Sequence, residues 1–131
     1  MGLFNFFGQV NELNKLSNAV GTIKSMLDDY HSEEDDAMLF VAAWLCKAGV
    51  TDLMDKNQWP MHYVFYVPID GTQTKLTMMQ AQMMTSSRIM MIASMRCSEE
   101  TKKTVFEILD GGPAFDLVDS KVPQDLRRII E

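Results

Sequence analysis

The sequence predicts one α+β domain: an N-terminal helical pair packed on a three-stranded antiparallel meander, followed by C-terminal helices. Three observations predict this class. Apolar residues recur with helical spacing over 3–30, aromatic and β-branched residues are concentrated in 62–77, and a further helical pattern begins at Ser98. With 131 residues, 47% of them apolar, and no repeat or linker, residues 1–131 form a single domain with one core.

The first predicted helix spans residues 3–30, where apolar residues follow in steps of three and four. Four of them lie seven residues apart, a spacing that suits packing along another helix of this chain or of a second copy. We therefore expect a homodimer or an internal helix pair. The predicted helix-packing or dimer residues are Phe6, Leu13, Val20 and Leu27.

The second predicted helix begins at Ser32, a favourable N-cap that is followed by four acidic residues, with Asp35 at the third helical position. Lys47 lies near its expected end and Gly49 just past it. The body of this helix, AMLFVAAWLC, is apolar on every side. It is therefore predicted to run through the middle of the fold.

Asp70-Gly71 predicts a two-residue hairpin turn in which Ile69 opposes Thr72. A second turn at 85–88 would continue the same apolar face into a third strand. On that face Gln80 and Gln82 have no obvious partner. The alternative is one helix over 75–97, because Met, Gln, Ala and Leu favour helix over strand, and it would make the protein an all-α helical bundle.

Ser98, Glu99 and Glu100 predict the start of a helix that ends at Gly111. The segment that follows, up to residue 123, is interpreted as a loop. Residues 124–130 are expected to form a last short helix.

Seven of the twelve methionines fall in residues 77–95. Thioethers can bind Cu(I), but neighbouring residues of a strand point to opposite faces, so packing or an apolar surface is the favoured interpretation. The outer face of the predicted meander turns apolar at its far end, as expected for a surface that is covered either by a partner or by the two N-terminal helices. The predicted partner-binding residues are Met79, Met83, Met90 and Ile92.

No catalytic, cofactor or metal site is predicted. Cys46, Cys97, His31 and His62 lack the spacing of a zinc site. The acidic stretch DDYHSEEDD, residues 28–36, lacks the residue order of a calcium loop, and helix capping explains most of it.

The net charge of −6 arises in that same acidic stretch, which holds six of the eighteen acids. The remainder of the chain is balanced, so no nucleic acid partner is expected. The N-terminus lacks the basic region of a secretory signal, and a cytoplasmic location with reduced thiols is predicted. The longest apolar run, ten residues, is about half the length of a spanning helix.

These patterns favour a small protein-binding module, an adaptor, chaperone or inhibitor, that docks an apolar segment of a partner protein on the Met-rich face. The alternative is a peripheral membrane protein anchored by the amphipathic N-terminal helix, whose first residues are GLFNFFGQV. An enzyme is not expected, because no cluster of polar residues can be nominated as a site.

Overall fold

The computed structural model describes residues 3–131, apart from the side chains of residues 3–7 and 9. The chain folds into a mostly helical α+β structure with one β-hairpin. The elements are α1 (Leu3–Asp28), η1 (Glu33–Asp35), α2 (Asp36–Cys46), η2 (Lys47–Thr51), α3 (Asp52–Asn57), β1 (Val64–Ile69), β2 (Thr72–Thr77), α4 (Met78–Gln82), η3 (Met83–Ser87), α5 (Arg88–Arg96), α6 (Glu99–Leu109), α7 (Pro113–Asp119) and α8 (Gln124–Ile130).

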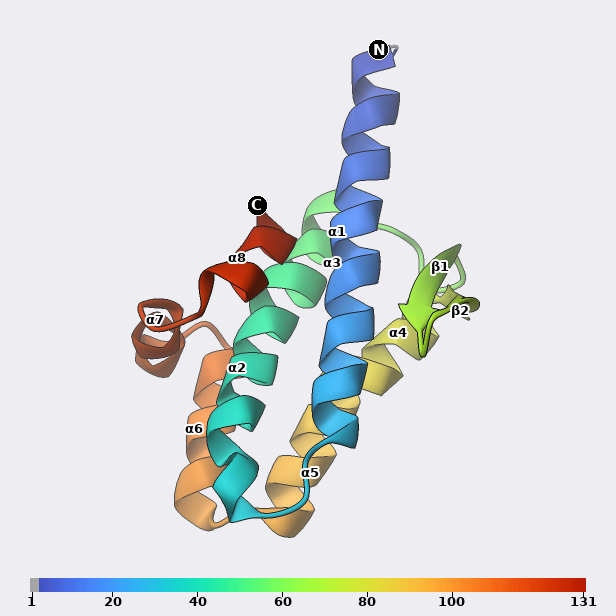
Figure 1. Cartoon of the computed structure of the whole chain (residues 1–131). Helices are drawn as coiled ribbons and strands as arrows, with labels where there is room; N and C mark the ends of the chain where they lie inside the picture. Colours follow the sequence, from blue (N-terminus) through green and yellow to red (C-terminus); the bar gives the residue numbers. More distant parts are fainter. Residues whose placement is uncertain (1–2) are drawn as a thin grey trace.

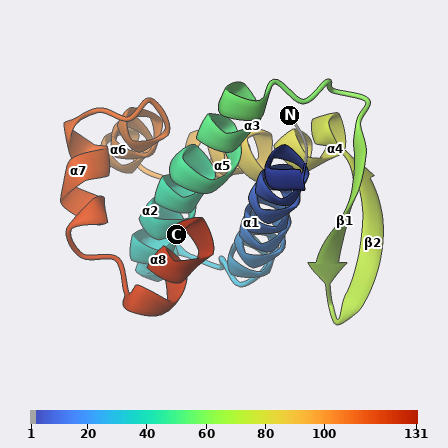
Figure 2. The same ribbon diagram turned by 90° about the horizontal axis from the view of Figure 1, so that it is seen from above.

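Seen from above, the elements follow one another across the molecule in the order α7, α6, α2, α1 and hairpin, and α4 and α5 run along one side (Figure 2).

The core lies between α1 and the continuous helix made of η1, α2, η2 and α3, which run side by side (Figure 1). As predicted, Ser32 caps this helix, and Asp35 closes the capping box. Five consecutive residues of α2, from Ala42 to Cys46, are buried because α1, α6 and α7 surround them. The apolar body of this helix therefore runs through the middle of the fold, as its composition indicated.

The predicted hairpin is confirmed in its turn and in its register, with Ile69 opposite Thr72 and Phe65 opposite Leu76. Phe65 and Val67 are buried on the inner face. The outer edge of β1 is covered by α1, where the Ser17 hydroxyl donates a hydrogen bond to the Tyr66 carbonyl. Such cover protects a strand edge from pairing with another chain.

The predicted third strand is wrong. After β2 the chain forms one helix from Met78 to Arg96, made of α4, η3 and α5, so the sheet has two strands. Thr77 and Gln80 form a capping box: the Thr77 hydroxyl accepts from the Gln80 N–H at 3.1 Å, and the Gln80 side chain accepts from the Thr77 N–H at 2.8 Å. The helical alternative was therefore right for this segment, although the hairpin excludes an all-α protein.

The predicted end of the second helix at Gly49 is also wrong. The helix continues through η2, a π-turn, to Asn57, and Gln58 ends it in the left-handed conformation at φ 50°. Gly49 lies within the π-turn, where an added Cβ would come within 3.0 Å of the Ala19 Cβ of α1. The glycine therefore serves the close approach of two helices rather than a helix stop.

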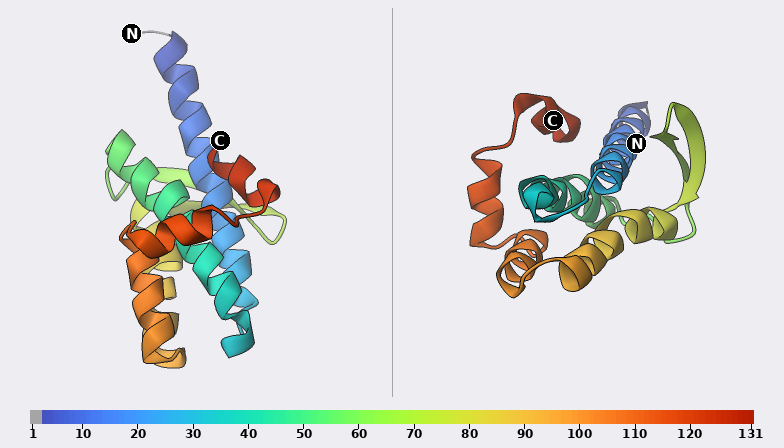
Figure 3. Two further views of the ribbon diagram at one scale, coloured as in Figure 1. Left: turned by 90° about the vertical axis from the view of Figure 1, so that its left-hand side faces the viewer. Right: turned by 60° about the horizontal axis from the view of Figure 1, so that its bottom comes forward.

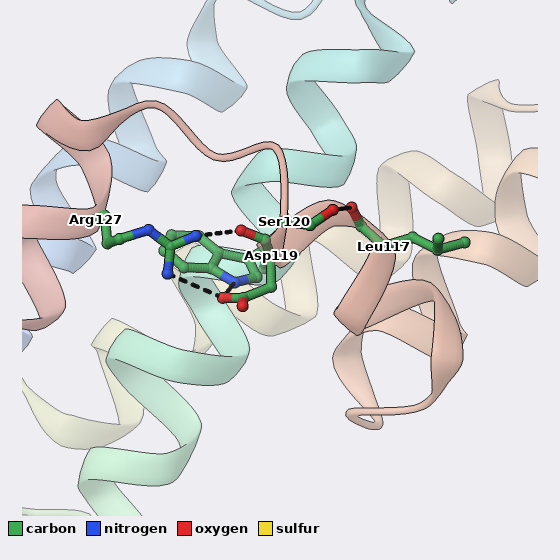
Figure 4. Close-up of polar contacts among 5 residues, drawn as sticks. Leu117, Asp119, Ser120 and Arg127 are labelled. Atoms are coloured by element: carbon green, nitrogen blue, oxygen red, sulfur yellow. Dashed lines mark hydrogen bonds and ion pairs between the residues drawn. The ribbon is translucent and has the colours of Figure 1, made fainter.

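At the C-terminus, the predicted Ser98 cap, the stop at Gly111 and the short helix over 124–130 are confirmed. The segment interpreted as a loop instead contains α7, with Pro113 in its first turn, a position where proline favours helix. Figure 4 shows how this end is attached to the core. The Asp119 carboxylate accepts from the Trp44 indole N–H at 2.9 Å and pairs with Arg127 of α8 at 3.3 Å, so one residue links α2, α7 and α8.

Candidate partner-binding surface

The helix from Met78 to Arg96 carries a row of exposed methionines, which we call the methionine stripe. Their exposed fractions are 54% for Met79, 62% for Met83, 55% for Met91 and 77% for Met95. Single exposed apolar side chains are ordinary on a protein surface, whereas a row of four along one helix indicates a surface that another molecule covers.

The π-turn η3 keeps these four side chains on one side of the helix. Because each residue of an α-helix turns ~100°, four steps of four residues would carry the side chains ~160° around the axis. A π-turn inserts one extra residue into a turn and takes back ~100° of that rotation, which leaves a spread of ~60°. The helix thus presents a stripe ~24 Å long, at 1.5 Å per residue from Met79 to Met95.

Two side chains of η3 form hydrogen bonds with carbonyl groups of the preceding turn. The Thr85 hydroxyl donates to the Ala81 carbonyl at 2.8 Å, and the Ser86 hydroxyl donates to the Gln82 carbonyl at 3.3 Å. Both bonds reach back four residues, and bonds of this kind compete with the backbone ladder and bend helices. Thr85 is fully buried on the opposite side of the helix from the stripe.

The methionine stripe is free of charged side chains. The helix contains two arginines and no acid, and both arginines are turned toward the C-terminal end of α1. Arg88 donates to the Asp28 carboxylate at 2.7 Å, and Arg96 donates to the His31 carbonyl at 2.6 Å while its guanidinium lies over the Tyr30 ring. A partner that covers the stripe therefore has no charge to desolvate on it.

At its N-terminal end the stripe continues onto the segment before β1. The Met79 N–H donates to the Met61 carbonyl at 3.0 Å, and the Met78 N–H donates to the Tyr63 carbonyl at 2.9 Å. The side chains of Met61 and Tyr63 are exposed as well. The apolar surface therefore spans two elements.

The structure separates the four residues predicted from the sequence to bind a partner. Met79 and Met83 lie on the stripe, Met90 is half-buried, and Ile92 belongs to the core with an exposed fraction of 8%. Met91 and Met95 were missed, because a third strand would have turned both toward the core. The signal that could have found them is the pair Thr77 and Gln80, which has the spacing of a capping box.

Three of the four predicted helix-packing residues of α1 contribute to the protein's own core. Val20 and Leu27 are buried, and Leu13 is partly buried against the core. Phe6 lies in α1, and its side chain is outside the described part of the chain.

A polar cluster joins the ends of α1, α2 and α5, but its geometry is that of a structural junction. The Tyr30 hydroxyl donates to the Asp36 carboxylate at 2.9 Å, lies 3.3 Å from the Cys97 sulfur, and Thr101 donates to the other Asp36 oxygen at 3.1 Å. Burial raises the pKa of the Tyr30 phenol and of the Cys97 thiol, so neither group is activated as a nucleophile.

The second cysteine is still less reactive. Burial raises the pKa of the Cys46 thiol to about 11. Within residues 3–131, no three His, Cys, Asp or Glu side chains converge closely enough to hold a metal ion.

Apart from the stripe, an apolar hollow of about 300 Å³ lies between α2 and α7. Leu117 and Val118 line it on one side and Phe40 and Val41 on the other. Leu117 is the only one of these four whose side chain is largely exposed, so the hollow offers a partner much less apolar surface than the methionine stripe.

One helix in the described part of the chain, Glu33–Asn57, is long and apolar enough to cross a membrane by length and composition. More than half of its most apolar window is buried in the fold, and the central helix of an ordinary folded domain passes the same test.

The fold and the surface define the class: a mostly helical α+β domain with a single hairpin and an uncharged methionine stripe on its outer helix. The chain matches no protein-family model, no curated protein and no solved structure.

Proposed function

We propose that the protein is a small protein-binding module, an adaptor, chaperone or inhibitor without catalytic activity, which docks an apolar segment of another polypeptide on the methionine stripe. The observation that carries the proposal is the alignment of four exposed methionines along ~24 Å of one helix. This length matches a partner helix of about sixteen residues.

The chemistry of methionine supports a protein partner. Its unbranched thioether side chain adapts to irregular apolar surfaces, and proteins that accept varied apolar segments use surfaces of this kind. A partner helix with apolar residues at steps of three and four could lie along the stripe as helices do in apolar grooves. We place this binding in the cytoplasm, where both thiols stay reduced.

Photo-crosslinking tests the proposal most sharply. A photoreactive amino acid replaces Met83 in the full chain, and a matched control carries it at Lys121, an exposed position outside the stripe. In the native host, position 83 is expected to crosslink a defined protein that position 121 does not capture.

Substitution of the stripe provides the second arm of this test. In the protein that carries the photoreactive amino acid at position 83, Met79→Gln together with Met91→Gln should abolish capture, because glutamine is polar but equally helix-forming. Leu117→Gln on α7 should leave capture intact. Equal capture by the protein without further substitutions, by the stripe variant and by the Leu117→Gln variant would contradict the proposal.

A further inference from the structure

The first part of α1 projects beyond the body of the molecule, at the end opposite α5 (Figures 1 and 3). Among the described side chains of α1, Glu12 pairs with Lys56 of α3 and Leu13 packs against the core. Val10 is 40% exposed, and a Cβ added at Gly8 would have nothing within 4 Å. We call residues 3–11 the N-terminal arm.

The N-terminal arm has the composition of a segment that needs cover. Its sequence, LFNFFGQVN, holds three phenylalanines, a leucine and a valine, and no charged residue. The arm continues the 26-residue helix α1, so its helical form needs no separate nucleation, and its apolar, uncharged composition is the reason to expect contact with another surface. The arm points away from the helix that carries its own methionine stripe (Figure 1).

We infer that the N-terminal arm of one copy covers the methionine stripe of a second copy, and that the exchange is reciprocal in a two-fold symmetric dimer. The inference rests on the proposed function, because it takes the stripe to be a docking surface. It adds that the arm of a second copy occupies the stripe when no other partner is bound. Partner proteins would then compete with the arm for the stripe.

Charge and area support a second copy as the occupant. Neither the arm nor the stripe carries a charged side chain, so their contact leaves no charge buried. In a helix, residues 4, 6 and 7 span ~160° around the axis, so about two of the three phenylalanines can face one surface and bury roughly 300–500 Å². A reciprocal dimer contains two such contacts, and each copy contributes one arm and one stripe, so the interface is of the order of the ~800 Å² per partner of a standard interface.

A membrane surface fits the arm less well. The first basic residue is Lys15, the acidic Glu12 precedes it, and Lys24 is paired with Asp28 at 2.6 Å. A helix that binds anionic lipid is rich in Lys and Arg on its polar face, and the net charge of −6 opposes such binding.

Complementation between two variants of the full chain tests the inference. The arm variant is Val10→Glu, and the stripe variant is Met83→Lys with Met91→Lys. All three positions are exposed or project from the body, and both new residues favour helix. Leu117→Lys on α7 is the control, and circular dichroism verifies that every variant is folded.

Sedimentation velocity over a range of concentrations gives the readout. The wild type and the control should dimerise, and the arm variant and the stripe variant should each dimerise at least tenfold more weakly. An equimolar mixture of the arm variant and the stripe variant should recover dimer, because one arm–stripe contact in the mixed dimer is unaltered and the other pairs Glu with Lys.

Other outcomes overturn the inference. If the arm variant alone fails to dimerise and the mixture does not recover, the arms pair with each other. If the wild type is monomeric and floats with anionic vesicles while Val10→Glu does not, the arm binds membrane. A monomeric wild type whose position 83 still crosslinks a different protein would overturn the inference and leave the proposed function standing.

Discussion

At the scale of single residues, two glycines of α1 have opposite surroundings. A Cβ at Gly21 would lie 2.6 Å from the Pro68 carbonyl oxygen at the edge of β1, a backbone atom that cannot move without the strand. A Cβ at Gly8 would meet nothing within 4 Å. The first glycine therefore lets the helix approach the hairpin, and the second only weakens the helix.

We predict that Gly21→Ala destabilises the fold by about 1–3 kcal/mol, the usual cost of overpacking. Gly8→Ala is the matched control and should be neutral or stabilise by up to ~1 kcal/mol through helix propensity. Urea unfolding followed by circular dichroism measures both changes. A Gly21→Ala protein as stable as the wild type would show that α1 does not contact the β1 edge this closely.

Asp119 is the second residue on which a whole element depends, because its carboxylate accepts from Trp44 and pairs with Arg127. We predict that Asp119→Ala lowers the free energy of unfolding by about 1–3 kcal/mol, since the indole N–H of the buried Trp44 loses its acceptor. Asp119→Asn keeps an acceptor oxygen and should recover most of the loss. Urea unfolding followed by tryptophan fluorescence measures both, and equal effects of the two substitutions would contradict the account.

At the scale of elements, the sequence predicted what local signals specify. The caps at Ser32 and Ser98, the Asp70-Gly71 turn and the short last helix all follow from side chains within four residues of the feature. The helix from Met78 to Arg96 was misassigned because two independent turns happened to give one consistent apolar face. Gln80, one of the two glutamines that did not fit that face, is the residue that closes the capping box.

Both π-turns lay outside what the sequence could predict. They depend on tertiary contacts: Gly49 approaches Ala19 of α1, and Thr85 is fully buried in the core. The π-turn η3 decides which methionines share one side of the helix, so Met91 and Met95 could not be assigned to the stripe without the structure. Met79 and Met83 were predicted, because both are exposed in a strand and in a helix alike.

We predict that deletion of Ser87 is tolerated. A π-turn contains one residue more than an α-turn, so removing exposed Ser87 converts η3 into regular α-helix and leaves the phase of the helix on both sides unchanged. Deletion of exposed Ser94, outside the π-turn, should rotate the end of α5 by ~100° and destabilise the junction with α6.

Thermal unfolding of the two deletion variants separates these cases. The protein without Ser87 should keep a cooperative transition within a few degrees of the wild type, and the protein without Ser94 should unfold at a clearly lower temperature. Equal losses would mean that η3 does not absorb the extra residue.

At the scale of the whole molecule, the methionine stripe and the N-terminal arm both lie outside the packed layers of the single chain. The core between α1 and α2 is closed by α6, α7 and the hairpin, and Asp119 fastens α7 and α8 over it. The methionine stripe and the N-terminal arm remain outside this core, at different ends of the molecule (Figure 1). The contact that we propose between two molecules would cover both, and that contact is the central claim.

Methionine methyl NMR tests this claim most directly. In protein labelled at the methionine methyl carbons, a soluble paramagnetic probe broadens every methyl group that faces solvent. In dilute protein the signals of Met79, Met83, Met91 and Met95 should broaden strongly while those of buried Met54 and Met78 do not. At higher concentration the stripe signals within the ~14 Å that an arm of nine residues spans should become protected as the surface is covered. Broadening of all four that does not change with concentration would contradict the account.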